Sequence, residues 1–162
     1  MLKRYLTVSL CLLALTLSAF AQTTKKSAIQ KATAGPIPDK ASLQKICDGW
    51  STLDPANVAK FYTTTGAHVF FDIAPLKYGS WDEYAKGVQG LAATYKSAKF
   101  TLNDDLAVHP HGDLVWVTAT VADQMTTRAG KVEMGNLRWT AIFENEDGKW
   151  LIVHEHVSAP IP

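Results

Sequence analysis

Two histidines near the C-terminus stand two residues apart in an otherwise largely apolar segment. If the segment is a strand, alternation places His154 and His156 on the same face. Imidazole changes charge near neutral pH, so this pair could transfer a proton or hydrogen-bond a ligand. With a nearby carboxylate, two histidines at this spacing could also chelate zinc or iron. The alternative is that both are hydrogen-bonded structural histidines.

Asp72 is the third candidate for chemistry, because it ends a short strand-like segment that begins at His68. A carboxyl group beside an apolar cavity is harder to ionise, which suits a general base or acid. We therefore predict a catalytic group made of Asp72 with His154 or His156. The alternative for Asp72 is a carboxylate that forms the turn before the Ile-Ala-Pro sequence that follows it.

Aromatic side chains are abundant, and most of them must belong to the core. An indole or phenol group buries a large area yet needs a polar partner, so those near the open end of a cavity can contact a ligand. We expect Tyr78, Trp116 and Trp139 to do so. Arg138 could clamp a carboxylate of the ligand if it points inward, whereas outward it is a solvated strand charge.

The last expected strand decides which of these side chains meet. One of its faces changes from apolar to polar along the strand, as expected where a core opens into a cavity, and we assign this face to the pocket. It carries Trp150, Ile152, His154, His156 and Ser158. The opposite face could pack against a second subunit. It carries Leu151, Val153, Glu155 and Val157. A one-residue bulge would exchange the two sets.

The segments before this strand predict helices first. Apolar residues recur at helical spacing from Leu43 to Leu53 behind a possible cap at Asp39 or Ser42, and Asp54-Pro55 starts a brief second helix. Ser80 to Glu83 reads as a capping box ahead of a third helix, in which the serine and the glutamate satisfy each other's exposed amides.

After Lys96 the apolar period changes to two, which predicts four long strands around residues 100–108, 115–121, 137–143 and 150–157. Short turns connect them around residues 110–113, 128–130 and 146–149, so consecutive strands must be antiparallel neighbours. The fold class is therefore α+β, with three helices packed on a strongly curved antiparallel sheet of four long strands and one or two short ones. Such a sheet leaves a cavity at its open end.

The N-terminus has the pattern of a secretory signal, with Lys3 and Arg4 before an apolar run and small residues at Ala19 and Ala21. We predict a signal peptide over residues 1–21, a flexible linker over 22–38, one domain over 39–162, and a secreted or periplasmic location. The apolar run is shorter than the roughly 20 residues that cross a bilayer, so we expect no membrane attachment after cleavage.

Cleavage would leave 14 basic and 15 acidic residues, a net charge of −1, with no basic stripe of the kind that binds nucleic acid. Cys47 would remain as the sole cysteine, which precludes an internal disulfide. No phosphate loop, dinucleotide fingerprint or nucleophile elbow occurs, so we expect no nucleotide cofactor.

The closing stretch from Phe143 to Ser158, together with Val69-Phe70-Phe71-Asp72 and with Gly79 and Trp81 ahead of the capped helix, resembles the NTF2-like superfamily. It is similar to SnoaL-like and DUF4440-like members and to kinase association domains. The resemblance implies the cone fold, a pocket and frequent homodimers.

In this resemblance Asp72 matches the general-base aspartate of ketosteroid isomerase-like members. The isomerase pattern also needs a tyrosine in the first helix and an aspartic acid in a central strand, where this sequence has Ile46 or Cys47, and Thr140. The donors that would stabilise an oxyanion are thus missing from those positions.

The first functional hypothesis is therefore a pocket that binds a small, partly apolar molecule. The second is a cofactor-free lyase, isomerase or hydrolase that uses Asp72 with His154 or His156. The third is an oligomerisation domain whose apolar sheet face builds the assembly.

Overall fold

A computed structural model describes residues 35–161 of the chain. The predicted signal peptide, and the predicted linker up to residue 34, lie outside the described residues. Within residues 35–161, no helix combines the length and the apolar character needed to cross a bilayer.

Helix α1 spans Lys40–Trp50 and confirms the first expected helix. Asp39 and Ser42 form a capping box, in which each side chain accepts a hydrogen bond from the other's backbone N–H at 2.8 Å. The brief second helix is a pair of 3₁₀ turns, η1 over Pro55–Asn57 and η2 over Ala59–Phe61.

Helix α2 spans Trp81–Ala92 and begins at the predicted cap, because Ser80 Oγ accepts the Glu83 N–H at 3.3 Å. The glutamate side chain reaches past Ser80 and accepts the N–H of Gly79 instead, at 2.7 Å. The ring of Tyr78 packs against α2 at Gly87, where a Cβ atom would lie 2.3 Å from the ring. Only a glycine allows this close approach.

A six-stranded sheet forms the other layer of residues 35–161, with the order β1-β6-β5-β4-β2 and with β3 also paired to β4. Four strands are long and two are short, as expected. The long strands are β2 (Tyr95–Leu102), β4 (Leu114–Thr127), β5 (Val132–Glu146) and β6 (Lys149–Ser158). The short strands are β1 (Phe70–Phe71) and β3 (Ala107–His111). Neighbouring strands are antiparallel except β1, which runs parallel to β6.

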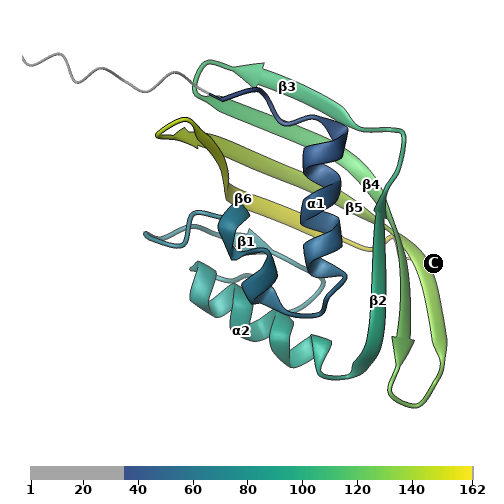
Figure 1. The fold of residues 1–162 in the computed structure, drawn as a ribbon. Coiled ribbons are helices and arrows are strands. Elements are labelled where there is room, and N and C mark those ends of the chain that lie inside the picture. Colours follow the sequence, from purple (N-terminus) through teal and green to yellow (C-terminus); the bar gives the residue numbers. More distant parts are fainter. Residues whose placement is uncertain (1–34, 162) are drawn as a thin grey trace, which may run out of the picture. The chain divides into compact units, whose positions relative to one another are not determined.

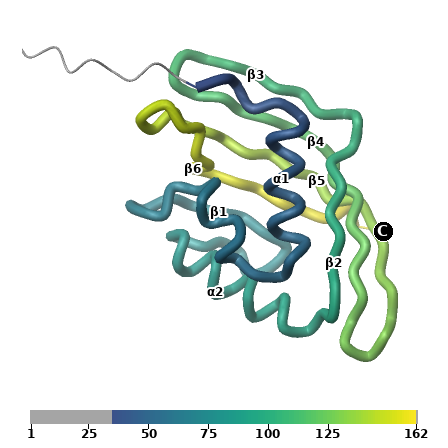
Figure 2. The backbone as a smooth tube through the Cα atoms, in the orientation of Figure 1, coloured from purple at the N-terminus to yellow at the C-terminus, as the bar shows by residue number. Residues whose placement is uncertain are grey.

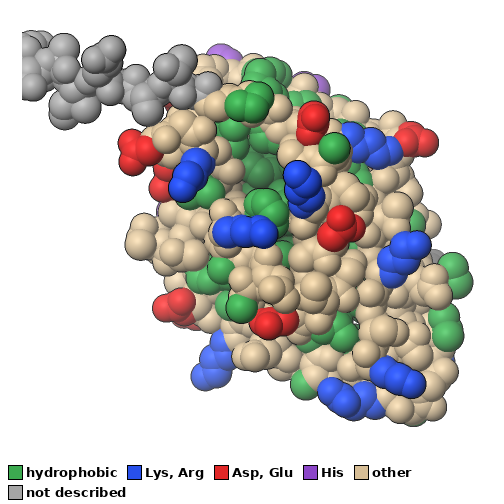
Figure 3. Space-filling model, in the orientation of Figure 1, with side chains coloured by type: hydrophobic (Ala, Val, Ile, Leu, Met, Phe, Trp, Pro, Cys, Tyr) green, Lys and Arg blue, Asp and Glu red, His purple; other side chains and the backbone are tan. Residues whose placement is uncertain are grey.

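The sheet curves, and α1 and α2 lie on the same side of it (Figure 1). The backbone tube shows that the β4–β5 hairpin continues past α2 (Figure 2). Basic and acidic side chains are interspersed around hydrophobic ones on the face that carries the helices (Figure 3). This α+β architecture is the one predicted from the sequence.

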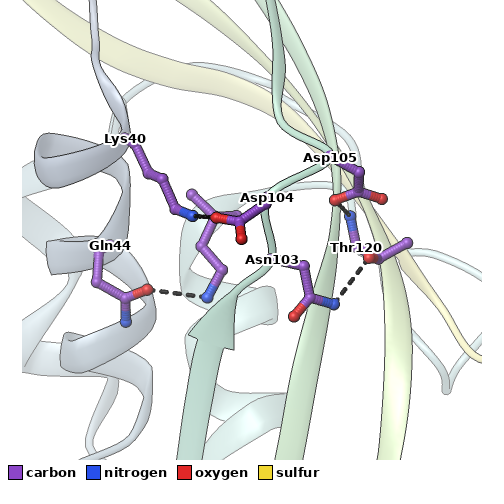
Figure 4. Close-up of polar contacts among 7 residues, drawn as sticks. Lys40, Gln44, Asn103, Asp104, Asp105 and Thr120 are labelled. Atoms are coloured by element: carbon purple, nitrogen blue, oxygen red, sulfur yellow. Dashed lines mark hydrogen bonds and ion pairs between the residues drawn. The ribbon is translucent and has the colours of Figure 1, made fainter.

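The expected first long strand is in fact two strands, β2 and β3, separated by a polar corner (Figure 4). At this corner Asp105 accepts the N–H of Thr120 at 2.9 Å, and Asn103 donates to the Thr120 hydroxyl at 2.8 Å. Helix α1 is tied to the same place, since Lys40 pairs with Asp104 and Gln44 accepts the N–H of Leu102 at 2.8 Å. The corner lets one chain segment pair with both ends of β4.

Candidate functional site

A cavity of about 130 Å³ lies between the helices and the concave face of the sheet. Helices α1 and α2 contribute Trp50 and Val88 to its wall, and β4 and β5 contribute Val121 and Leu137. Nearly all of the wall is aliphatic or aromatic. Its only carboxyl groups are Asp72 and Glu155, and no lysine, arginine or histidine among the described residues lines it.

A β-bulge in β6 decides which residues of that strand face the cavity. His154 pairs with Ile142, whereas the next residue of β5, Phe143, pairs with Ile152, so Val153 is the extra residue. A bulge of this kind breaks the simple alternation of faces. Ile152 and Glu155 therefore both point inward and are 0% and 2% exposed.

The expectation that His154 and His156 line the hollow is wrong, because the bulge turns both away from it. Each ring packs on Phe71 of β1 in a T-shaped arrangement, with its centroid 5.6 Å (His154) or 5.7 Å (His156) from that of Phe71. His154 Nδ1 donates to the carbonyl of Val69 at 2.7 Å. The structure does not bring either histidine into the cavity with Asp72.

The same bulge corrects the expected subunit face. Glu155 and Val157 line the cavity instead of the outside of the sheet. The face predicted to meet a second subunit therefore cannot consist of this set of residues.

Glu155 is the polar centre of the site and accepts three hydrogen bonds. The hydroxyls of Tyr62 and Tyr84 donate to Oε2 at 2.7 and 3.0 Å, and the indole N–H of Trp139 donates to Oε1 at 2.5 Å. Trp50 extends the network by donating to the Tyr62 hydroxyl at 2.9 Å. A carboxylate has about four acceptor positions, so the network leaves about one unused.

Burial raises the pKa of Glu155 to about 7. The negative charge of Asp72 also raises this pKa, whereas the three hydrogen-bond donors lower it. Burial and the Glu155 charge also raise the pKa of Tyr62 and Tyr84 well above 10. Both tyrosines therefore remain protonated donors at neutral pH. Glu155 itself can gain or lose a proton in that range.

Asp72 directly follows β1, the strand beside β6 in which Phe70 pairs with Glu155, and it lines the same cavity as Glu155. Its Oδ1 accepts the N–H of Ile73 at 2.7 Å, which matches the turn-forming role considered for it. Burial nevertheless raises its pKa. Asp72 is half-buried, so a ligand in the cavity can reach it.

Of the residues expected to contact a ligand, Trp139 alone lies in the cavity wall. Tyr78 is buried against α2, and its hydroxyl donates to the carbonyl of Ala74 at 2.8 Å. Trp116 is 42% exposed and stacks on His109 with centroids 3.7 Å apart. Arg138 is exposed beside the C-terminal segment, which corresponds to its outward alternative.

Glu155, Tyr62 and Tyr84 are site residues that the sequence did not predict. The sequence does contain one indication of Glu155, since it is the single acid in the largely apolar stretch from Leu151 to Val157. An acid that is buried in such a strand needs hydrogen-bond partners. Within residues 35–161, no group of three or more His, Cys, Asp or Glu side chains is arranged to hold a metal ion.

A curved sheet, helices on its concave side and an apolar cavity with one buried carboxyl define an α+β pocket domain. The SnoaL-like domain family matches residues 40–162, and the chain belongs to this family. No curated protein matches the chain significantly.

Many solved structures share the fold. The NTF2-like superfamily protein from Salmonella enterica serovar Typhimurium LT2 is 16% identical with a TM-score of 0.69, over 76% of this chain and 89% of that one. An NTF2-like protein from Pseudomonas putida KT2440 is 22% identical with a TM-score of 0.61, over 74% and 82%. A protein proposed to be a scytalone dehydratase from Novosphingobium aromaticivorans is 9% identical with a TM-score of 0.64, over 74% and 79%. At these identities the likeness concerns the fold alone.

Proposed function

We propose that this chain is a secreted or periplasmic pocket protein that binds a small, partly apolar molecule. The observation that carries the proposal is the apolar cavity with one hydrogen-bonded carboxyl, Glu155, at its centre. Ligand sites generally combine an apolar wall with a few oriented polar groups. The location rests on the signal-like sequence from Lys3 to Ala21.

A defined neutral probe tests whether the cavity accepts a ligand. Propylbenzene should bind and change the intrinsic tryptophan fluorescence, because Trp50 and Trp139 line the cavity. Titration of the purified protein gives the dissociation constant, and native mass spectrometry of the same preparation identifies any molecule that co-purifies.

A cavity-filling variant provides the structural test. In Val88→Phe the added ring should occupy the space beside α2 and weaken propylbenzene binding by about tenfold or more. Val132→Phe is the matched control, since Val132 is 53% exposed and outside the cavity wall. Equal binding by Val88→Phe and the wild type would show that the probe sits elsewhere.

Acid–base catalysis without a cofactor is the second candidate. It is supported by the two carboxyl groups in one apolar cavity, one of which, Glu155, titrates with a pKa near 7. Asp72 and Glu155 would then be the reacting pair, in place of Asp72 with His154 or His156. Conversion of a co-purified molecule by the wild type but not by Glu155→Gln, followed by mass spectrometry, is the expected sign of this activity.

A homodimer through the outer sheet face also belongs to the proposal. On this face Leu114 and Trp116 are 41% and 42% exposed on β4, and Met134 is 76% exposed on β5. Sedimentation analysis should show a dimer that Trp116→Lys converts to a monomer. A wild-type protein that sediments as a monomer would contradict this assignment.

A further inference from the structure

We propose that the cavity selects a cationic ligand, a protonated amine carried on a small apolar or aromatic body. The inference rests on the proposed function, because it names the chemical class of the molecule that the same cavity would hold.

The charges of the cavity wall all have one sign. Asp72 and Glu155 are acidic, and the described wall residues include no lysine, arginine or histidine. Arg138, the cation that could have met a carboxylate, is exposed and does not line the cavity. A ligand carboxylate would enter an apolar space beside two acids without a counter-ion, which is strongly unfavourable.

Asp72 is the acid that has room for a partner. Glu155 already accepts hydrogen bonds from two tyrosines and one tryptophan. Asp72 accepts only the N–H of Ile73 among the contacts of the described residues, and no cation of these residues is paired with it. Its second oxygen is therefore available to a donor on the ligand, and a charged donor forms the stronger hydrogen bond.

The remainder of the wall suits the body and the charge of such a ligand. Aromatic rings from Trp50, Tyr84, Tyr95, Phe100 and Trp139 line the same cavity. Aromatic rings attract cations through their electron-rich faces and also cover an apolar body. A wholly apolar ligand would also be covered by the rings, but it would leave the second oxygen of Asp72 without a hydrogen-bond donor.

Four probes that share a phenyl ring test the inference: 2-phenylethylammonium, 2-phenylethanol, propylbenzene and 3-phenylpropionate. The first three differ only in the terminal group, which is an ammonium, a hydroxyl or a methyl. Affinities measured by tryptophan fluorescence at pH 8, where the amine is still protonated, should rank the ammonium about tenfold above the alcohol, with the carboxylate weakest.

Asp72→Asn removes the charge at nearly constant shape and should abolish the preference for the ammonium over the alcohol. Asp82→Asn, an exposed residue in the first turn of α2, removes an equal charge away from the cavity and should keep the preference. Circular dichroism verifies that both variants fold. The ranking in the wild-type protein decides the matter even where a variant does not fold.

The outcomes separate the inference from the proposed function. Binding of propylbenzene without preference for the ammonium overturns the cation selectivity and leaves the pocket function standing. A preference that survives in Asp72→Asn overturns the assignment of Asp72 as the partner of the cation. Failure of all four probes to bind overturns the pocket function and the inference with it.

Discussion

Glu155 binds a proton at a pH at which an exposed glutamate does not, and the stability of the protein should report this. Glu155→Gln keeps the side-chain shape and removes the titration. The titratable groups that face Glu155 are Tyr62, Tyr84, Cys47 and Asp72, and like the indole of Trp139 they are the same in both proteins. The difference in unfolding free energy between wild type and variant therefore isolates this one carboxyl group.

The direction follows from the two pKa values. In the unfolded chain the carboxyl group has the ordinary value of 4.5, and in the folded protein the value is about 7. The folded state holds the proton more tightly, so the contribution of Glu155 to stability is complete below pH 4.5 and is lost as the pH rises through 7. Between these two limits the contribution of Glu155 to the unfolding free energy falls by roughly 3 kcal/mol.

Urea unfolding followed by tryptophan fluorescence from pH 4 to pH 8.5 measures this difference. The variant can be less stable at every pH, because its amide group faces three hydrogen-bond donors. The quantity to compare is therefore the slope of the free-energy difference with pH. Glu144→Gln on β5, an exposed position, is the charge-matched control. A difference between wild type and Glu155→Gln that is flat, or that grows in favour of the wild type as the pH rises, would refute the reasoning.

Three further predictions concern packing, reactivity and capping. Gly87→Ala should lower the unfolding free energy by about 1–3 kcal/mol in urea, because the new Cβ would lie 2.3 Å from the ring of Tyr78; an unchanged midpoint would contradict this packing. Burial, with the nearby charge of Glu155, raises the pKa of the Cys47 thiol to about 12, so a thiol reagent at pH 8 should modify Cys47 only after unfolding, and rapid labelling of the native protein would disprove its burial. Asp39→Ala should cost about 1 kcal/mol through loss of the α1 capping box, while Asp48→Ala on the same helix serves as its control in thermal unfolding.

Most of the elements could be predicted because their signals are local. Capping residues, apolar spacing and turn residues lie within a few positions of the structure that they determine. The corner between β2 and β3 could not be found in this way, because its residues bind Lys40, Gln44 and Thr120, which are far away in the sequence.

Some residues of the site could likewise be predicted from the sequence, and others could not. The sequence by itself indicated the cone, the acid at Asp72 and the indole of Trp139 in the wall. It could not identify Glu155, because the alternation of β6 holds only up to the extra residue at Val153, and that bulge arises from the pairing of β6 with β5. The tertiary structure alone decided that a carboxyl group rather than two imidazoles enters the cavity, since one unpaired residue exchanges the two faces of a strand.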